Sequence, residues 1–266
     1  MFIGADFRPW FVYCKKLKRI YQKKEKNMRT KKCGNWIVRG LLMGALLFAV
    51  SGMTSPAWAD DAEQSAQLAD KARMTLENFV KAQEMEAFRN LLKDARGVFI
   101  APQILKGAFV IGASGGSGVF VVRDRKTGTW AGPAFYTIGE VSFGFQAGGE
   151  ASEVILLAMT DRGITALLGN SAKLGADIGI AVGPVGMGAA ASTANLSADI
   201  VTFASSKGLF GGIALDGALI KVRNGLNEAY YSKKNVTPTD ILIQRTVTNP
   251  QAESLIRSVA AAVEGK

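Results

Sequence analysis

The 266-residue chain contains no histidine, and its two cysteines, Cys14 and Cys33, both lie near the N-terminus. Without histidine the chain cannot form a Ser-His or Cys-His nucleophile system. Beyond Cys33 it also lacks the nitrogen and sulfur ligands of the usual zinc sites. These absences exclude the commonest hydrolytic and zinc-dependent chemistries, and no metal or cofactor is predicted. They also mean that the rest of the chain folds without disulfide bonds.

Excess positive charge is confined to the first 59 residues. They hold 12 Lys and Arg against 2 Asp and Glu, so residues 60–266 contain 20 of each sign and carry no net charge. A strongly basic chain would suggest nucleic acid as a partner. A neutral main part, preceded by a short basic stretch, favours a targeting segment instead.

The basic stretch has the three parts of a secretory signal. Lys31, Lys32 and Arg39 precede the apolar run 41–50, and Ala57-Trp58-Ala59 follows as a cleavage site. A membrane anchor is the alternative, but ten apolar residues are too few when a span takes about 20. The sequence therefore predicts a signal peptide at 28–59 and an exported protein, periplasmic or secreted, with no nucleic-acid partner. Residues 1–27 are interpreted as an over-extended start.

Segment 60–96 is predicted to be helical. Apolar residues recur at three- and four-residue steps from Leu68 through Leu76 and Phe79 to Phe88. One bent helix and two consecutive helices fit this pattern equally well. The stripe predicts packing on the rest of the domain, with a membrane-surface helix as the alternative.

Segment 97–223 is predicted to be β-rich. Runs of β-branched and aromatic residues alternate with turn signals, and 23 glycines occur among residues 107–225. Repeated glycines within strands are typical of a strongly coiled or barrel-like sheet. We expect Gly211 and Gly212 to lie mid-strand and to tolerate bulk poorly. We expect GASGGSG, residues 112–118, to link two strands.

Three shorter segments have signals of their own. DRKTGTW, residues 124–130, is predicted to be a hairpin turn, and 161–169 a short helix. Segment 224–266 is predicted to be a helical tail, capped by Asn249 with Pro250 at the first helical position. Residues 60–266 therefore form one predicted domain of the α+β class, with a Gly-rich antiparallel barrel-like β-sheet flanked by N-terminal and C-terminal helices.

GPVGMGAAAS, residues 183–192, imitates a dinucleotide-binding fingerprint, and Tyr230 and Lys234 have a spacing found in some reductases. The fingerprint requires a strand before it and a helix after it, whereas strand-like residues follow here. Glu140, Glu150 and Glu153 could supply a carboxylate pair, but nothing in the sequence fixes a catalytic separation. An enzyme is therefore not predicted.

The ordered strings of the β-rich segment resemble the SYLF domain family, over about residues 68–243. No single string is decisive, but their order and spacing are specific. The matching strings are ARGVFIAP (95–102), GASGGSGVFVVRD (112–124), GTWAGPAFYTIGEVSFGFQAGGE (128–150), DIGIAVGPVGMGAAA (177–191), SSKGLFGGIALDGALI (205–220) and NEAYYSK (227–233).

The resemblance implies a non-enzymatic domain that binds phospholipid, here an anionic phospholipid or membrane surface of the cell envelope. Eukaryotic members are linked to phosphoinositides and some to actin; actin is judged improbable for an exported chain. The family's lipid contact is usually placed at its N-terminal helix and nearby basic residues. That implies the lipid-binding residues Lys71, Arg73, Leu76, Phe79, Lys81, Phe88, Arg89, Lys93 and Arg96. An outer-membrane β-barrel, a structural envelope protein and, less favoured, a carboxylate-dependent enzyme are the alternatives.

Overall fold

A computed structural model describes residues 57–108, 111–143, 148–186, 198–211 and 215–265. The helices are α2 (Ala57–Lys81), η1 (Gln83–Met85), α3 (Glu86–Asp94), α4 (Asp161–Leu168), α5 (Asn224–Tyr231), α6 (Pro238–Leu242), η3 (Pro250–Ala252) and α7 (Glu253–Glu264). The strands are β1 (Gly97–Ala108), β2 (Ile111–Arg123), β3 (Trp130–Phe143), β4 (Gly148–Ala158), β5 (Ser171–Lys173), β6 (Ile180–Val182), β7 (Ile200–Ser206), β8 (Leu209–Gly211) and β9 (Leu219–Val222).

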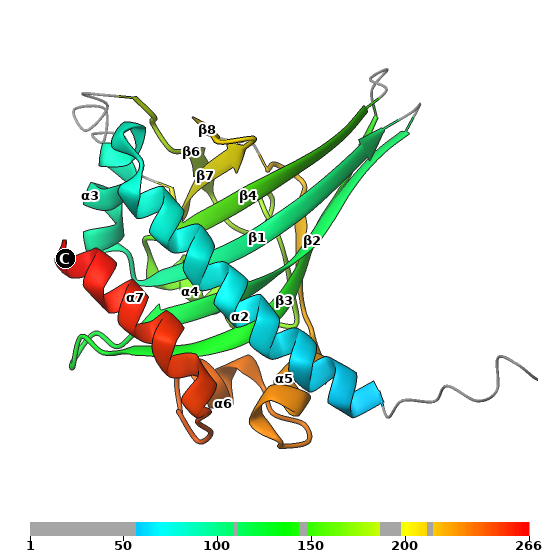
Figure 1. Cartoon of the computed structure of the whole chain (residues 1–266), viewed down its shortest axis with the longest axis vertical. Helices are drawn as coiled ribbons and strands as arrows, with labels where there is room; N and C mark the ends of the chain where they lie inside the picture. Colours follow the sequence, from blue (N-terminus) through cyan, green and yellow to red (C-terminus); the bar gives the residue numbers. More distant parts are fainter. Residues whose placement is uncertain (1–56, 109–110, 144–147, 187–197, 212–214, 266) are drawn as a thin grey trace, which may run out of the picture. The chain divides into compact units, whose positions relative to one another are not determined.

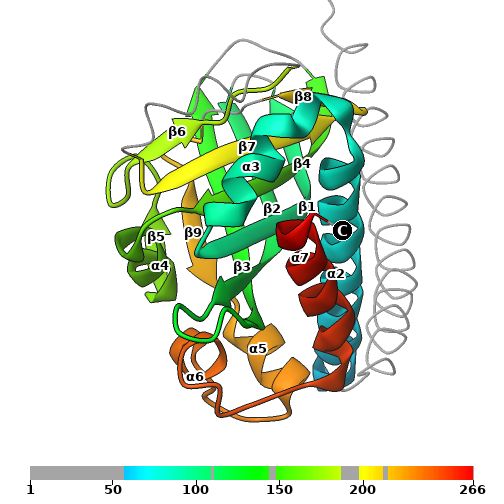
Figure 2. The same ribbon diagram turned by 90° about the vertical axis from the view of Figure 1, so that its left-hand side faces the viewer.

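The described strands form one strongly curled sheet in the order β5-β9-β3-β2-β1-β4-β7-β6, with β8 paired to β7. All pairs are antiparallel except β6 with β7. Helices α2 and α7 cross one side of the sheet, and α4 lies on the other (Figures 1 and 2). The predicted α+β class, with helices at both ends of a curled sheet, is confirmed.

The core fills both faces of the sheet, because strand residues alternate between them. On one face, Phe99 and Phe120 meet the ring of Tyr136 edge-on, and the Tyr136 hydroxyl donates to the Leu167 carbonyl of α4 at 2.8 Å. On the other face, Phe135 packs edge-on against Tyr230 of α5. Because both faces are buried, the sequences of these strands are nearly continuous apolar runs.

A β-bulge at Pro102 divides the four long strands. The register of β1 shifts there against both β2 and β4, and a bulge is where a central strand tolerates proline, which cannot donate to the ladder. We call residues 97–101, 118–123, 130–136 and 154–158 the near halves of β1–β4. Residues 103–108, 111–117, 137–143 and 148–153 are their far halves. The far halves project beyond α2 (Figure 1).

Two expectations about glycine were wrong. GASGGSG does not link strands but lies inside β2, where Gly116 approaches the Gln103 carbonyl oxygen and Gly118 the ring of Phe99. A side chain at either glycine would collide with the neighbouring strand, so the close approach requires both. Gly211 ends β8 instead of lying mid-strand, and a Cβ there would meet open space. Gly212 lies outside the described residues.

Several shorter predictions are confirmed by the backbone. The turn at 124–129 joins β2 to β3, and α4 begins at Asp161 with Thr160 as its cap. Asn249 caps the tail as expected, although its first turn is the 3-10 helix η3. Most of the predicted signal peptide lies outside the described residues. Only its last three residues are described, and they begin α2. No described helix is long and apolar enough to cross a membrane.

Candidate functional site

The apolar part of the predicted lipid site belongs to the core. Leu76, Phe79 and Phe88 are all fully buried. Phe79 packs edge-on against Phe88 and against Phe210 of β8, with ring centroids 5.7 and 5.1 Å apart. In this structure these side chains cannot contact lipid, so their amphipathic pattern reflects packing on the sheet. Packing was the preferred interpretation of the stripe from sequence.

The basic part of the predicted site does not form one surface. Arg73 and Lys81 both pair with Glu77, at 2.7 and 3.9 Å. Arg89 donates to the carbonyls that end α2, among them that of Val80 at 3.0 Å. Lys71 lies elsewhere, beside the far halves. The last two cations, Lys93 and Arg96, lie close to the β2–β3 turn.

Glu77 shows how strongly these helices are tied together. Its carboxylate also accepts a hydrogen bond from Ser258 of α7, at 3.1 Å. Partial burial opposes ionisation of Glu77, but the hydrogen bonds from Arg73 and Ser258 outweigh it and lower the pKa. Arg73 and Glu77 are therefore better explained as a link between α2 and α7 than as a contact for headgroups.

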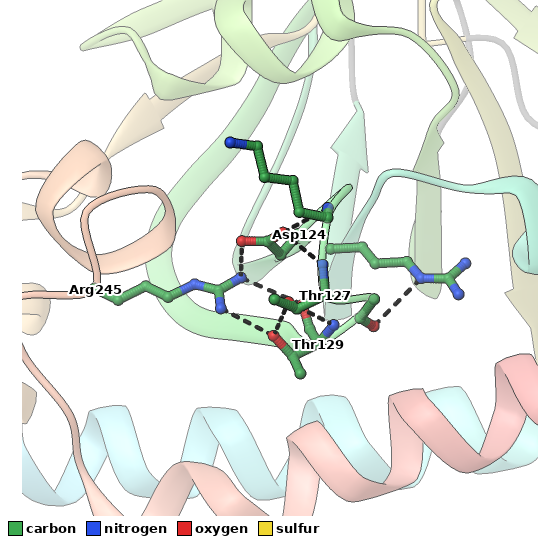
Figure 3. Close-up of polar contacts among 7 residues, drawn as sticks. Asp124, Thr127, Thr129 and Arg245 are labelled. Atoms are coloured by element: carbon green, nitrogen blue, oxygen red, sulfur yellow. Dashed lines mark hydrogen bonds and ion pairs between the residues drawn. The ribbon is translucent and has the colours of Figure 1, made fainter.

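The β2–β3 turn is held by its own side chains (Figure 3). The Asp124 carboxylate accepts the backbone N–H groups of Lys126 and Thr127, at 2.7 and 3.0 Å. Aspartate commonly closes a turn in this way. These two bonds are the main reason that the pKa of Asp124 lies below its usual range. The turn therefore presents Arg125 and Lys126 outward from a fixed backbone.

Arg245 clamps this turn from the distant loop after α6 (Figure 3). Its guanidinium donates to the hydroxyl and the carbonyl of Thr129, at 2.9 and 3.3 Å, and pairs with Asp124 at 3.5 Å. The backbone of Arg245 is in the left-handed region, with φ of 56°. The C-terminal part of the chain thus fixes a turn 116 residues earlier in the sequence.

Around this turn lies a cleft of about 360 Å³, which we call the basic cleft. Its lining contains two carboxylates, Asp124 and Asp161, and an apolar edge formed by Leu242 and Ile243. Half of the Ile243 surface is exposed. The cationic lining residues, which come from three separate segments of the chain, are Arg96, Arg123, Arg125, Lys126 and Arg245.

Asp161 joins two of the cations of the basic cleft. Its carboxylate accepts from Arg96 at 2.7 Å and from Arg125 at 2.8 Å. The hydrogen bond from Arg96 is the main reason that the pKa of Asp161 lies below its usual range. Two guanidinium groups that hold one anionic group already have the geometry to hold another, because arginine suits carboxylate and phosphate alike.

The candidate enzymatic groups are not brought together. Glu140 lies on β3, and β2 and β1 separate it from the other two glutamates on β4. Glu150 and Glu153 are bonded separately, to Ser206 at 2.6 Å and to Thr75 at 2.8 Å. Among the described residues there is also no cluster of metal-ligating side chains. Residues 187–192 of the apparent fingerprint lie outside the described part of the chain.

The fold and the site define an α+β domain with a basic surface cleft. Residues 139–262 match the family model described as "Ysc84: Las17-binding protein actin regulator". The human SH3 domain-containing YSC84-like protein 1 is 32% identical over 168 residues, which cover 62% of this chain and 48% of that protein. Protein YSC84 of Saccharomyces cerevisiae is 30% identical over 197 residues, covering 70% of this chain and 41% of the yeast protein.

LAS seventeen-binding protein 3 of the same yeast is 30% identical over 196 residues, covering 70% of this chain and 42% of that protein. The chain thus spans about half the length of the curated relatives, or less. It carries a domain of the Ysc84, or SYLF, family, and the resemblance seen in the sequence is confirmed.

The family match corrects one prediction about partners. Actin was judged improbable, but the family description names an actin regulator, and one relative is named for binding LAS seventeen. The exclusion was wrong because it rested on the predicted export of this chain.

Sequence reasoning missed most of the basic cleft. The signal for Arg125 and Lys126 was present in DRKTGTW, where two cations occupy a predicted turn and must face solvent. Arg123 ends β2 beside them. Arg245 gave no such signal, because only the tertiary fold brings the loop after α6 to this turn.

Proposed function

We propose that this chain is a non-enzymatic binding domain that attaches to anionic phospholipid surfaces through the basic cleft. The observation that carries the proposal is the convergence of five cationic side chains from three segments around one cleft with a half-exposed isoleucine at its edge. The basic cleft has five cations against two carboxylates, although residues 60–266 as a whole are neutral.

The physical basis is a sum of modest contributions. A basic side chain near an anionic membrane contributes about 1 kcal/mol, and burial of a large aliphatic side chain contributes about 1.5–3 kcal/mol. Asp124 and Asp161 offset part of the electrostatic attraction. Arg125 and Lys126 can reach a surface, and Ile243 can enter its edge. Binding should therefore be moderate and should weaken, without vanishing, as salt concentration rises.

Co-sedimentation with phosphatidylglycerol-containing vesicles tests this proposal. The variant Arg125→Gln/Lys126→Gln should bind about thirtyfold more weakly, since it removes two contributions of about 1 kcal/mol each. Lys81→Gln/Lys221→Gln is the matched control, because it removes two exposed charges outside the cleft. Equal loss in both variants would show that only net charge matters, and the proposed location would be wrong.

We also propose that the domain acts after export, on lipid of the cell envelope. The basic, apolar and small-residue parts of segment 28–59 support this proposal. N-terminal sequencing of the protein from an expressing bacterium should give Asp60 as the first residue. A protein that retains segment 28–59 would contradict the proposed export.

A second candidate function is attachment to actin filaments, favoured by the family match. Co-sedimentation of the purified protein with actin filaments tests it directly. Filament binding that survives Arg125→Gln/Lys126→Gln would place the protein contact outside the basic cleft. Absence of binding would leave the lipid proposal standing and would reject this second function.

A further inference from the structure

A second concave surface lies on the opposite side of α2 from the basic cleft. Two cavities, of about 340 and 300 Å³, share Lys71, Pro102 and Gln103 as lining residues. They therefore form one continuous depression, which we call the α2 groove. Its lining residues come mainly from α2 and from the far halves of the strands, which project beyond α2 (Figure 1).

The α2 groove has a floor and a wall, which differ in their side chains. The floor consists of small residues of the far halves, such as Gly115, Ser117 and Ser152. Such a floor lets another backbone approach closely. The wall is the face of α2 that runs from Gln64 to Asn78. At 1.5 Å per residue this wall is roughly 21 Å long, which matches about six residues of extended chain.

The charge of the α2 groove is positive. Its cations are Lys71, Lys207 and Arg223, whereas Glu153 is its single carboxylate among the lining residues. Glu153 already accepts the Thr75 hydroxyl at 2.8 Å. Lys71 and Lys207 are both exposed and form no ion pair within the described residues. The groove thus has two cations available for a ligand.

The backbone at Lys207 and the side chain of Arg223 are held in place. Lys207 has a φ of 50° in the tight β7–β8 turn, next to Gly208 with a φ of 77°. Arg223 donates to the Ser117 hydroxyl at 2.8 Å and to the Gln64 side chain at 2.9 Å. Apolar side chains flank them, since Met74 and Leu105 are each more than half exposed at the groove.

We propose that the α2 groove binds an extended acidic segment of a partner protein. The cations of the groove fit carboxylates that are spaced along a chain, and the amide and hydroxyl groups of the floor and the wall fit its backbone. Met74 and Leu105 fit its apolar side chains. A flat membrane would not reach the floor of this groove, whereas a single extended chain fits its length. The basic cleft lies across α2 and α7, so both surfaces can be occupied together.

Fluorescence anisotropy with a labelled ten-residue peptide of alternating glutamate and leucine tests the proposal, with the glutamine–leucine peptide as control. The full chain should bind the acidic peptide and not the neutral one. Lys71→Glu/Lys207→Glu should weaken binding by at least about tenfold, because two attractive contacts become repulsive. Arg125→Gln/Lys126→Gln should leave peptide binding unchanged while it weakens vesicle binding.

A variant without a charge change separates groove occupancy from general electrostatics. Gly115→Leu places a side chain on the floor, where a Cβ would meet only the Ile138 carbonyl oxygen at 3.7 Å. The fold should tolerate this residue, as an unchanged melting temperature would show, and peptide binding should fall at least tenfold. The inference is overturned if the parent does not bind the acidic peptide. It is equally overturned if groove variants bind it normally, or if they lose vesicle binding instead.

Discussion

The near and far halves of β1–β4 share the same hydrogen-bonded ladders but contain different side chains. In the near halves Phe99, Phe120 and Leu156 are fully buried. In the far halves, among residues whose environment is described, only Ile104 and Ile138 are buried. Backbone pairing therefore continues where side-chain burial stops. The near halves hold the domain together, while the far halves supply a floor on which another chain can lie.

Removal of a large side chain should separate the two halves most clearly. Phe120→Ala should lower the free energy of unfolding by about 3–5 kcal/mol, because it leaves a cavity between Phe99 and Tyr136. Leu105→Ala, in the far half of β1, should change it by less than about 0.5 kcal/mol, because that side chain is mostly exposed. Urea denaturation of both variants measures the difference. Similar losses would mean that the far halves also contribute to the core.

Neighbouring glycines sharpen the comparison within one far half. Gly116→Ala should cost about 1–3 kcal/mol, because its Cβ would meet the Gln103 carbonyl oxygen of the adjacent strand. Gly115→Ala should cost almost nothing, since a Cβ there has room. Thermal melts of the two variants provide the measurement. If Gly115→Ala is the worse of the pair, the described approach of β2 to β1 is wrong.

A third change tests how α5 holds the near half of β3. The buried Asn227 side chain of α5 accepts the Phe135 N–H at 2.9 Å and donates to its carbonyl at 3.3 Å. Asn227→Ala should cost about 1–2 kcal/mol, because the Phe135 N–H loses its partner in a buried place. Asn78→Ala, exposed on α2, is the control and should be close to neutral in the same urea experiment.

Local signals predicted the fold well and the site poorly. The Asp124 turn, the helix at Asp161 and the Asn249 cap each depend on side chains next to the backbone that they shape, so the sequence contains the cause. GASGGSG was misread because glycine gives no alternation of side chains by which a strand is recognised. The stripe containing Phe79 has the same pattern whether it faces a sheet or a membrane. Contacts such as Arg245 with Thr129 depend on tertiary packing alone.

The smallest expected effect is the pH dependence of stability that comes from the two carboxylates beside the β2–β3 turn. The pKa values of Asp124 and Asp161 are lowered, by backbone N–H groups and by Arg96 respectively. A carboxylate with a lowered folded-state pKa adds stability above its unfolded pKa of about 3.9, and this stability is lost as pH falls through the lower, folded value.

The melting temperature should therefore decline below about pH 4 more steeply in the parent than in Asp124→Asn/Asp161→Asn. Glu84→Gln/Asp216→Asn, which changes two exposed carboxylates away from the turn, should follow the parent. Because the Asp161 side chain is 62% exposed and that of Asp124 is 33% exposed, solvent screens their ion pairs and the difference should be small. Parallel profiles for all three proteins would show that the contacts around Asp161 orient the basic cleft without stabilising the fold.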